Sequence, residues 1–506
     1  MINKEKRQTY KLQRKHIFLI IILFLSLYFF LNIDIKSQTG EITLKQENIE
    51  PTETKEKVIL GEKIKQYVDN EIKNVIFITI DTLRADHLGF MGYPRNTSPF
   101  LDKLAKESFL FKNAYTVISS TNPSHASMFT SLYANQHKLT NNYEILDDSF
   151  ITMAEFFKEK NFKTNAFVAI PDYFSRSNLD QGFDVFMGPE NKSEISKEIV
   201  NLLIGSIANN NSDNNFLWAH FWEPHFPYQD RTSSDYVKKF QLSKEKEDKF
   251  IDFWTKEQGI NKEIYMEPSK DIMIDVLNSY DTEILVVDRE IERLYNYFEE
   301  SGLNEKTLWI ITIDHGEGLG SHNFYEHVGM LYEEQLLTPI IFAFPSSFLA
   351  EPKIIEDVVE NIDILPTLAE IIGFSLNDQK KEKQGDSFLS KILTNSKSKS
   401  DKNVFSWSGN IKGGKRFKSP IGEIIKSSSG TGEKFSIQNK KYKYIYNLKK
   451  ENEFYDLLKD PLENNNLINL DIEDKNLLKK LLLEKKEKLE MGSSDIEIRR
   501  ITPDKF

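Results

Sequence analysis

The chain has 506 residues and a formal net charge of −11, from 66 Lys and Arg against 77 Asp and Glu. This acidic balance argues against a nucleic-acid-binding protein, which needs a concentrated basic face. Hydrophobic residues at 39% and aromatic residues at 12% are enough for a large core, so wholesale disorder is excluded. The absence of cysteine excludes disulfides, cysteine-ligated zinc and a thiol nucleophile.

The chain opens with a basic segment followed by an apolar run. Residues 1–16 carry six Lys and Arg before the apolar residues 17–33, and polar residues 34–70 follow. A basic flank ahead of an apolar run predicts a cytoplasmic tail, a transmembrane signal-anchor and then a linker. A cleaved signal peptide is the alternative, although no small-x-small cleavage site follows cleanly. We therefore expect a single-pass membrane protein, with the rest of the chain extracytoplasmic.

Short apolar runs alternate with helical patterns along the next 300 residues or so. The runs have strand character and are apolar on both faces, which suits strands buried between helices: 75–80, 166–170, 216–222, 308–313 and 339–344. The helical patterns between them are 98–107, 124–133, 151–158, 274–300 and 362–372. This alternation predicts an α/β sandwich.

Two segments interrupt the alternation and suggest domain limits. Residues 229–270 are charged, with aromatics spaced through them, and are either a solvated insertion or a lid beside a site. The Lys- and Ser-rich residues 376–402 mark a boundary. We predict a main domain at 71–395 and a C-terminal subdomain with a tail helix at 396–506. Its predicted elements are strands at 441–447 and 454–457 and a helix at 472–489, with one face formed by Leu477, Leu478, Leu481 and Leu482.

The runs 75–80 and 308–313 end alike, each in the letters ITID. The first is followed by Asp81 and the second by Asp314 and His315. Ligands in α/β sheets bind at the carboxyl ends of strands, so these side chains converge if the two strands are parallel neighbours. Two carboxylates and an imidazole in one pocket indicate a divalent metal with mixed oxygen and nitrogen ligands. The alternative is that both Asp residues cap the helices that follow.

A possible nucleophile lies in the segment 119–127, where a helix is expected to start near Pro123. Thr121 would then lie on a surface-facing loop just ahead of the helix N-terminus. There the helix dipole favours an alkoxide and an anionic ester, and a metal on the same oxygen would lower its pKa further. Taken alone, the segment is also typical of an ordinary N-terminal loop.

Histidines gather in or near the same segments, which favours anion contacts or proton transfer. Of the nine in the chain, eight are in this group: His87, His125, His137, His220, His225, His315, His322 and His327.

From about residue 73 to 467 the chain resembles the sulfatase family of the alkaline phosphatase superfamily. Seven segments come in the family's order: IDTLRADHLGFMGY, TNPSHASMFTSLYANQH, HFWEPHFPY, YDTEILVVDREIERL, DHGEGLGSHNFYEHVGMLYEE, NIDILPTLAEIIG and EFYDLLKDPLENNNL. Any one of these segments is weak evidence for the family, but seven segments in the family's order are strong evidence. The resemblance implies an alkaline phosphatase-like α/β/α sandwich with a central mixed sheet and a small C-terminal subdomain, holding a metal-dependent ester hydrolase.

The resemblance also implies roles for individual residues. One divalent metal, Mn, Zn or Ca, would be held by four groups: Asp81, Thr121, Asp314 and His315. His225 and His327 would contact the ester or protonate its leaving group, and His125 stands where sulfatases have a supporting Arg. Calcium sulfatases commonly have Asn where this chain has His315, which favours manganese or zinc.

The main departure from the family is Thr121, which falls where sulfatases have the Cys or Ser that matures to formylglycine. Without that group, a phosphoester or phosphodiester is favoured over a sulfate ester. Thr82 also replaces the second Asp of the family's Asp-Asp pair. Two alternative functions remain: hydrolysis of sulfuric esters, and transfer of phosphate to a surface glycan or lipid. The substrate is accordingly a small-molecule, glycan or lipid ester.

Overall fold

The computed structural model describes a large part of the chain from residue 72 onward. The described residues are 72–191, 193–209, 214–228, 240, 245, 249–250, 270–325, 327–348, 350–376, 382–394, 402–409, 416–418, 424–426, 432–491 and 499–500. In that part, the helices are all too short or too polar to cross a bilayer. The predicted tail 1–16, anchor 17–33 and linker 34–70 lie outside it, as does most of the predicted insertion 229–270.

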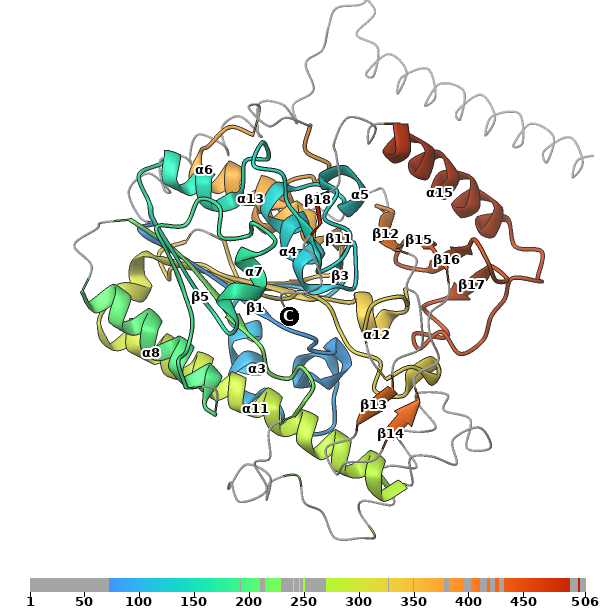
Figure 1. The fold of residues 1–506 in the computed structure, drawn as a ribbon, viewed down its shortest axis with the longest axis horizontal. Helices are drawn as coiled ribbons and strands as arrows, with labels where there is room; N and C mark the ends of the chain where they lie inside the picture. The colour runs from blue at the N-terminus through green and yellow to red at the C-terminus, as the bar shows by residue number, and fades with distance from the viewer. Residues whose placement is uncertain are drawn as a thin grey trace, which may run out of the picture. The chain divides into compact units, whose positions relative to one another are not determined.

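A central eight-stranded sheet organises the main domain (Figure 1). Its strand order is β10 (Lys353–Ile355), β2 (Phe109–Phe111), β9 (Ile340–Ala343), β8 (Thr307–Ile313), β1 (Asn74–Ile80), β7 (Asn215–Phe221), β5 (Lys163–Val168) and β6 (Val185–Met187). β9 pairs antiparallel with β8 and β2, and the other pairs are parallel. The mixed sheet expected from the sequence is therefore confirmed.

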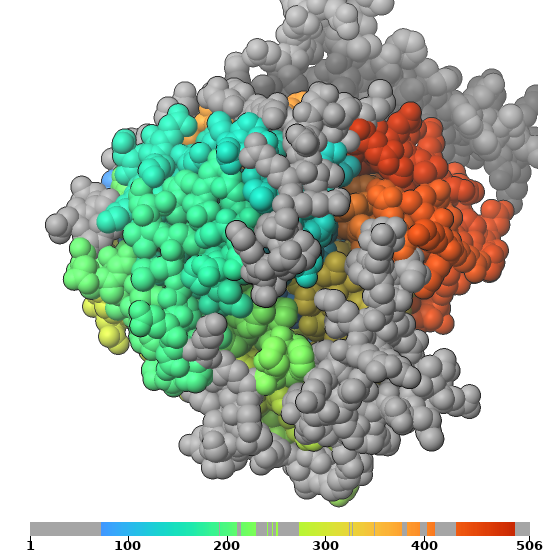
Figure 2. Space-filling model, viewed as in Figure 1, coloured from blue at the N-terminus to red at the C-terminus, as the bar shows by residue number. Residues whose placement is uncertain are grey.

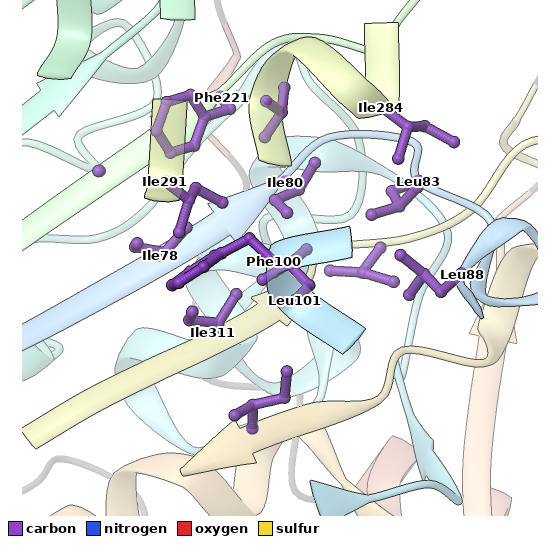
Figure 3. Close-up of a cluster of buried hydrophobic side chains, with 14 of the residues drawn as sticks. Ile78, Ile80, Leu83, Leu88, Phe100, Leu101, Phe221, Ile284, Ile291 and Ile311 are labelled. Carbon is purple, nitrogen blue, oxygen red and sulfur yellow. The ribbon is translucent and has the colours of Figure 1, made fainter. Parts of the chain in front are cut away.

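Helices cover both faces of this sheet. One face packs on α3 (Pro99–Lys106), α8 (Ile195–Ala208) and α11 (Lys270–Glu300), and the other on α4 (Thr121–Thr130), α6 (Met153–Glu159), α7 (Pro171–Ser175) and α13 (Ile364–Ile372) (Figure 1). Alternate residues of β1 point to opposite faces. Ile78 and Ile80 join the core with α3 and α11 (Figure 3). Phe77 meets Phe129 of α4 edge to face, with ring centroids 6.4 Å apart. Strands buried on both faces explain the uninterrupted apolar runs.

Shorter elements connect these layers. The helical ones are η1 (Ala85–His87), η2 (Gly89–Met91), α5 (Ala134–His137), η3 (Leu303–Lys306), η4 (Ser321–Asn323), α12 (Glu333–Leu336), η5 (Asn361–Asp363) and α14 (Leu389–Leu393). Three small strand pairs are β3 (Ala114–Tyr115) with β11 (Val359–Glu360), β4 (Glu144–Ile145) with β18 (Arg499–Arg500), and β13 (Arg416–Lys418) with β14 (Ile424–Lys426).

A second, antiparallel sheet forms the C-terminal part of the chain. It contains β12 (Val404–Ser408), β15 (Lys434–Gln438), β16 (Tyr442–Asn447) and β17 (Glu453–Asp456), and α15 (Glu473–Met491) packs on it. The sheet and α15 together form the orange and red surface at the right of Figure 2. The predicted apolar face of α15 needs one correction. Leu478 and Leu482 are buried and Leu481 is partly buried, but Leu477 is 52% exposed because it precedes the i, i+4 stripe by one position.

Polar contacts join this second sheet to the main domain. Trp407 of β12 donates its backbone N–H to the Val117 carbonyl at 2.9 Å, and the Ser406 hydroxyl donates to the Thr116 carbonyl at 2.9 Å. The buried ammonium of Lys443 in β16 lies 3.0 Å from Glu333 and 2.9 Å from Glu463. The C-terminal sheet is thus bonded to the segment that leads to α4 and to the segment that follows β8.

Candidate active site

Two aspartates meet at the carboxyl ends of neighbouring strands. β1 and β8 are parallel, with Ile80 opposite Ile313, so Asp81 and Asp314 leave the sheet side by side. The backbone N–H of Asp314 donates to the Ile80 carbonyl at 3.3 Å. Both side chains are fully buried. The convergence expected from the repeated ITID endings is present.

His315 completes a set of three candidate metal ligands. Its Nδ1–H donates to the Gly316 carbonyl at 3.0 Å, so the neutral ring presents the Nε2 lone pair on its other side. Nε2 lies 3.7 Å from Asp81 Oδ1 and 3.7 Å from Asp314 Oδ2. One ligand atom from each of the three residues lies within 4.8 Å of the other two. Ligands held at about 2.0–2.5 Å from one ion have this spacing.

The charges of this set call for a cation. Both carboxylate oxygens of Asp81 and Oδ2 of Asp314 are buried without a hydrogen-bond partner among the described residues. Burial raises the pKa of Asp81, and burial together with the charge of Asp81 raises the pKa of Asp314. Buried oxygens of this kind are stable as anions only when a positive charge compensates them. The donor set therefore fits a divalent ion with two carboxylates and one imidazole.

Thr121 lies against this set. It is the first residue of α4, with Ser120 as the N-cap, and it is 1% exposed. Its Oγ1 is 3.3 Å from His315 Nε2. The prediction that Thr121 lies on a surface-facing loop is therefore wrong. Helix α4 begins two residues earlier than predicted, and its first turn packs beneath the strand ends. The N-terminal amides of a ten-residue helix adjoin the hydroxyl, which is a favourable place for an anion.

His125 is in the same helix, but both of its ring nitrogens contact protein groups. Nδ1 donates to the Thr121 carbonyl at 2.8 Å, and Nε2 is 3.0 Å from the hydroxyl of Thr79. The ring is fully buried, and burial followed by the nearby His220 lowers its pKa well below the usual value. Its geometry suits holding α4 on the sheet better than exchanging a proton with a substrate.

His225 and His327 lie together beside the three ligands. Their ring centroids are 5.0 Å apart, and those of His315 and His327 are 4.7 Å apart. His225 Nδ1 donates to the carbonyl of Phe226. Burial lowers the pKa of His225 to about 4, against the opposing effect of Asp81. Both histidines thus border the centre where the sequence expected them.

Three further side chains border this set, and of these the sequence singled out only His220, as one of the grouped histidines. His220, on β7 opposite Thr79, brings Nε2 to 3.6 Å from Asp81 Oδ2. Glu317 lies 3.3 Å from His327 Nδ1. The pKa of Tyr173 on α7 is raised by burial and by Asp81, and its hydroxyl adjoins Thr121. His220 stands at the end of a third buried run, which is the signal the sequence offered for it; Glu317 and Tyr173 carry no such signal.

Comparison with known proteins identifies the family. The family model described as "Sulfatase" matches residues 73–374. The chain belongs to the sulfatase family. An "Ulvan-active sulfatase" of Formosa agariphila is 22% identical over 437 residues, covering 78% of this chain and 77% of that protein. An "Arylsulfatase" of Clostridium perfringens is 24% identical over 495 residues, covering 83% of this chain and 96% of that protein.

The fold of this sulfatase-family member is also found in solved structures. The phosphonate monoester hydrolase of Agrobacterium radiobacter superposes with a TM-score of 0.65 and 16% identity, covering 85% of this chain and 100% of that one. The alkaline phosphatase-like α/β fold expected from the sequence is therefore confirmed. As a member of the sulfatase family, the chain is a hydrolase acting on sulfate or phosphate esters.

Proposed function

We propose that this sulfatase-family chain is a metal-dependent hydrolase that uses Thr121 as its nucleophile and prefers phosphodiesters and other phosphoesters to sulfate esters. The observation that carries the proposal is the position of Thr121, with Oγ1 3.3 Å from His315 Nε2 at the start of α4. A chain without cysteine, with Thr at this position, has no residue there that the family's usual routes convert to formylglycine. A threonine oxygen instead attacks phosphorus directly.

Asp81, Asp314, His315 and Thr121 would hold the divalent cation, and the imidazole among them favours manganese or zinc over calcium. When bound, the cation would neutralise the carboxylates and act as a Lewis acid toward the ester. The first amides of α4 donate to the phosphoryl oxygens. Thr121 would react as the alkoxide, with its proton lost to solvent and the negative oxygen stabilised by the charge of the bound cation. That alkoxide oxygen forms a bond to phosphorus as the bond to the leaving oxygen breaks, and His327 gives the leaving oxygen a proton. Water then hydrolyses the phosphothreonine.

Substitutions of Thr121 test the proposal. The full chain in detergent is assayed on 4-nitrophenyl methyl phosphate, 4-nitrophenyl phosphate and 4-nitrophenyl sulfate with added manganese, zinc or calcium. Thr121→Ala should lower kcat by roughly three orders of magnitude or more, because the covalent route closes. Thr121→Ser keeps a hydroxyl and should keep partial activity. The matched control is Thr130→Ala, at the other end of the same helix, which should stay near the wild-type rate.

The outcomes separate the parts of the proposal. A wild-type rate in Thr121→Ala would remove Thr121 from the chemistry. A much faster turnover of the sulfate would favour the second candidate, a sulfuric ester hydrolase. That candidate is supported by the sulfatases named above, which include an ulvan-active enzyme. A glycan ester is then the substrate class to test next. A third candidate, transfer of phosphate to a surface glycan or lipid, predicts product formation only when an alcohol acceptor is added.

We also propose that residues 17–33 anchor the chain in the membrane, with the site outside the cytoplasm. The support is the basic segment 1–16 ahead of an apolar run. Protease added to intact spheroplasts should digest residues 71–506, because they face the medium. Digestion only after lysis would reverse the proposed orientation. A cytoplasmic marker enzyme that survives the protease serves as the control for intact cells.

A further inference from the structure

The loop after β8 carries a carboxylate directly against one of the two site histidines. Glu317 is 2% exposed, and its Oε2 lies 3.3 Å from His327 Nδ1. Its other oxygen accepts from the backbone N–H of Gly318 at 3.2 Å. A buried carboxylate with both oxygens engaged in this way has a fixed direction. It therefore fixes the ring that donates to it.

The backbone of this loop is held from the β1 side. Arg84 is fully buried, and its Nη1 donates to the carbonyl of Gly318 at 2.7 Å and to that of Glu317 at 3.4 Å. The same nitrogen donates to the hydroxyl of Ser321 at 2.9 Å. Because the guanidinium is a rigid donor, these bonds hold the backbone from which the Glu317 side chain reaches His327.

The two site histidines differ in what holds their Nδ1 atoms. His225 donates to the Phe226 carbonyl, which is a neutral acceptor, while His327 is paired with a carboxylate. A carboxylate stabilises the Nδ1–H tautomer and also the imidazolium, because a charge-assisted hydrogen bond is about twice as strong as a neutral one. Of the two rings, only His327 has a carboxylate at Nδ1, which orients the ring with Nε2 on the side away from Glu317.

We propose that Glu317 is a positioning residue for His327, and that this pair, rather than His225, supplies the proton to the leaving oxygen. The inference rests on the proposed function and deepens it. When the bond between the leaving oxygen and phosphorus or sulfur breaks, its electron pair stays on that oxygen and takes the proton from His327 Nε2. The neutral ring then accepts a proton from the water that attacks the ester of Thr121, which restores the imidazolium.

Leaving-group dependence tests this pair, because a weakly basic leaving group departs without protonation. Glu317→Gln in the full chain is assayed on phenyl and 4-nitrophenyl methyl phosphates, and on the matching sulfates. We expect kcat for the phenyl ester to fall about 10²-fold, with KM little changed and the 4-nitrophenyl ester nearly unaffected. The double variant with His327→Gln should be no slower than His327→Gln alone. Equal losses for both leaving groups, or additive losses in the double variant, would overturn the proposal.

Glu334→Gln is the matched control. Glu334 is also a buried carboxylate in the same segment of the chain, and it is paired with a different histidine, His322, at 2.8 Å. This variant should show no dependence on the leaving group. A leaving-group effect in Glu334→Gln as large as in Glu317→Gln would also count against the proposal, because disturbance of the segment would then explain both.

A readout without turnover keeps this inference separate from the proposed function. Nitrogen NMR of ¹⁵N-histidine-labelled protein, with His327 assigned through His327→Gln, reports which ring nitrogen is protonated. We expect His327 to carry hydrogen on Nδ1 in the wild type and to shift toward the Nε2–H form in Glu317→Ala. An Nε2–H ring in the wild type would overturn the positioning role. If only sulfates are cleaved, the preference for phosphoesters fails while the Glu317 inference is still tested.

Discussion

Asp81 and Asp314 are buried carboxylates whose surroundings do not compensate their charge. Asp314 Oδ1 accepts the backbone N–H groups of His315 at 2.7 Å and Thr82 at 3.3 Å, but Asp81 has no such donor among the described residues. Desolvation of an ion costs several kcal/mol unless partners return that energy. The pair therefore stores a free-energy penalty that a bound cation would remove.

Asp81→Asn should change stability in opposite directions with and without metal. In EDTA the variant should be about 1–3 kcal/mol more stable than the wild type, because a neutral amide replaces a buried charge. With manganese or zinc added, only the wild type should gain stability, since a ligand that binds the folded state stabilises it and the variant has lost one ligand of the metal. Urea unfolding under both conditions measures this. A wild type that does not respond to metal would contradict the proposed centre.

The sequence predicted the residues that meet through backbone register and missed those that meet through side-chain packing. Asp81, Asp314 and His315 converge because parallel strands of equal length end at the same sheet edge. The contact of Glu317 with His327 joins two side chains ten positions apart in a loop, which no strand register brings together. Thr79 accepts the indole N–H of Trp218 and also contacts two histidines, an arrangement set by ring packing across three elements.

At the scale of elements, the predicted strands were those buried on both faces and long enough to show as apolar runs. β2, β3 and β10 have only two or three residues, which is too short for any pattern. The apolar run of β9 was predicted, but its antiparallel direction was not, because an apolar run has the same appearance in either direction. Helix ends were predicted less well than helix existence, as the earlier start of α4 illustrates.

One helix is capped by another, which no local sequence signal indicates. The side chain of the N-cap residue of α3, Ser98, accepts no backbone N–H from the start of its own helix. The buried Asp288 of α11 instead accepts the backbone N–H groups of Phe100 at 3.0 Å and Leu101 at 2.8 Å. A carboxylate at a helix start satisfies otherwise unpaired donors and favours the helix dipole. α11 thereby fixes the position of α3 beneath β1.

Asp288→Ala should lower the free energy of unfolding by about 1–3 kcal/mol, because two buried N–H groups lose their acceptor. Chemical denaturation followed by circular dichroism measures the loss. Glu300→Gln, at an exposed position on the same helix, should stay within about 0.5 kcal/mol of the wild type. An equally small effect from Asp288→Ala would mean that water replaces the lost acceptor.

At the scale of the whole molecule, buried charges join the loop after β8 to the C-terminal sheet. His322 contacts Glu334 through Nδ1 at 2.8 Å and the carbonyl of Glu463 through Nε2 at 3.1 Å. Burial alone would lower the pKa of His322, but Glu334 outweighs it and raises that pKa to about 9. Burial raises the pKa of Glu463 to about 8, although Lys443 opposes the shift.

These pKa values predict that stability falls as the solution becomes alkaline. Both groups bind protons more tightly folded than unfolded, from ordinary values of 6.5 for His322 and 4.5 for Glu463. The contribution of His322 is complete below pH 6.5 and is lost as the pH rises through about 9. Urea unfolding between these limits should show the decline, at no more than about 1.4 kcal/mol per pH unit for each group. His322→Gln should reduce the decline to the part that Glu463 contributes, which ends near pH 8; an unchanged slope would assign the effect to other groups.

The bonds from β12 to residues 116 and 117 also limit how this protein can exchange parts with its relatives. These residues lie only a few positions before Thr121, the proposed nucleophile, so the segment that leads to it is partly shaped by a strand almost 300 residues away along the chain. A C-terminal sheet grafted from another member of the family would bring its own spacing to that contact. Chimeras that keep this contact should therefore be those that transfer residues 114–118 together with the sheet.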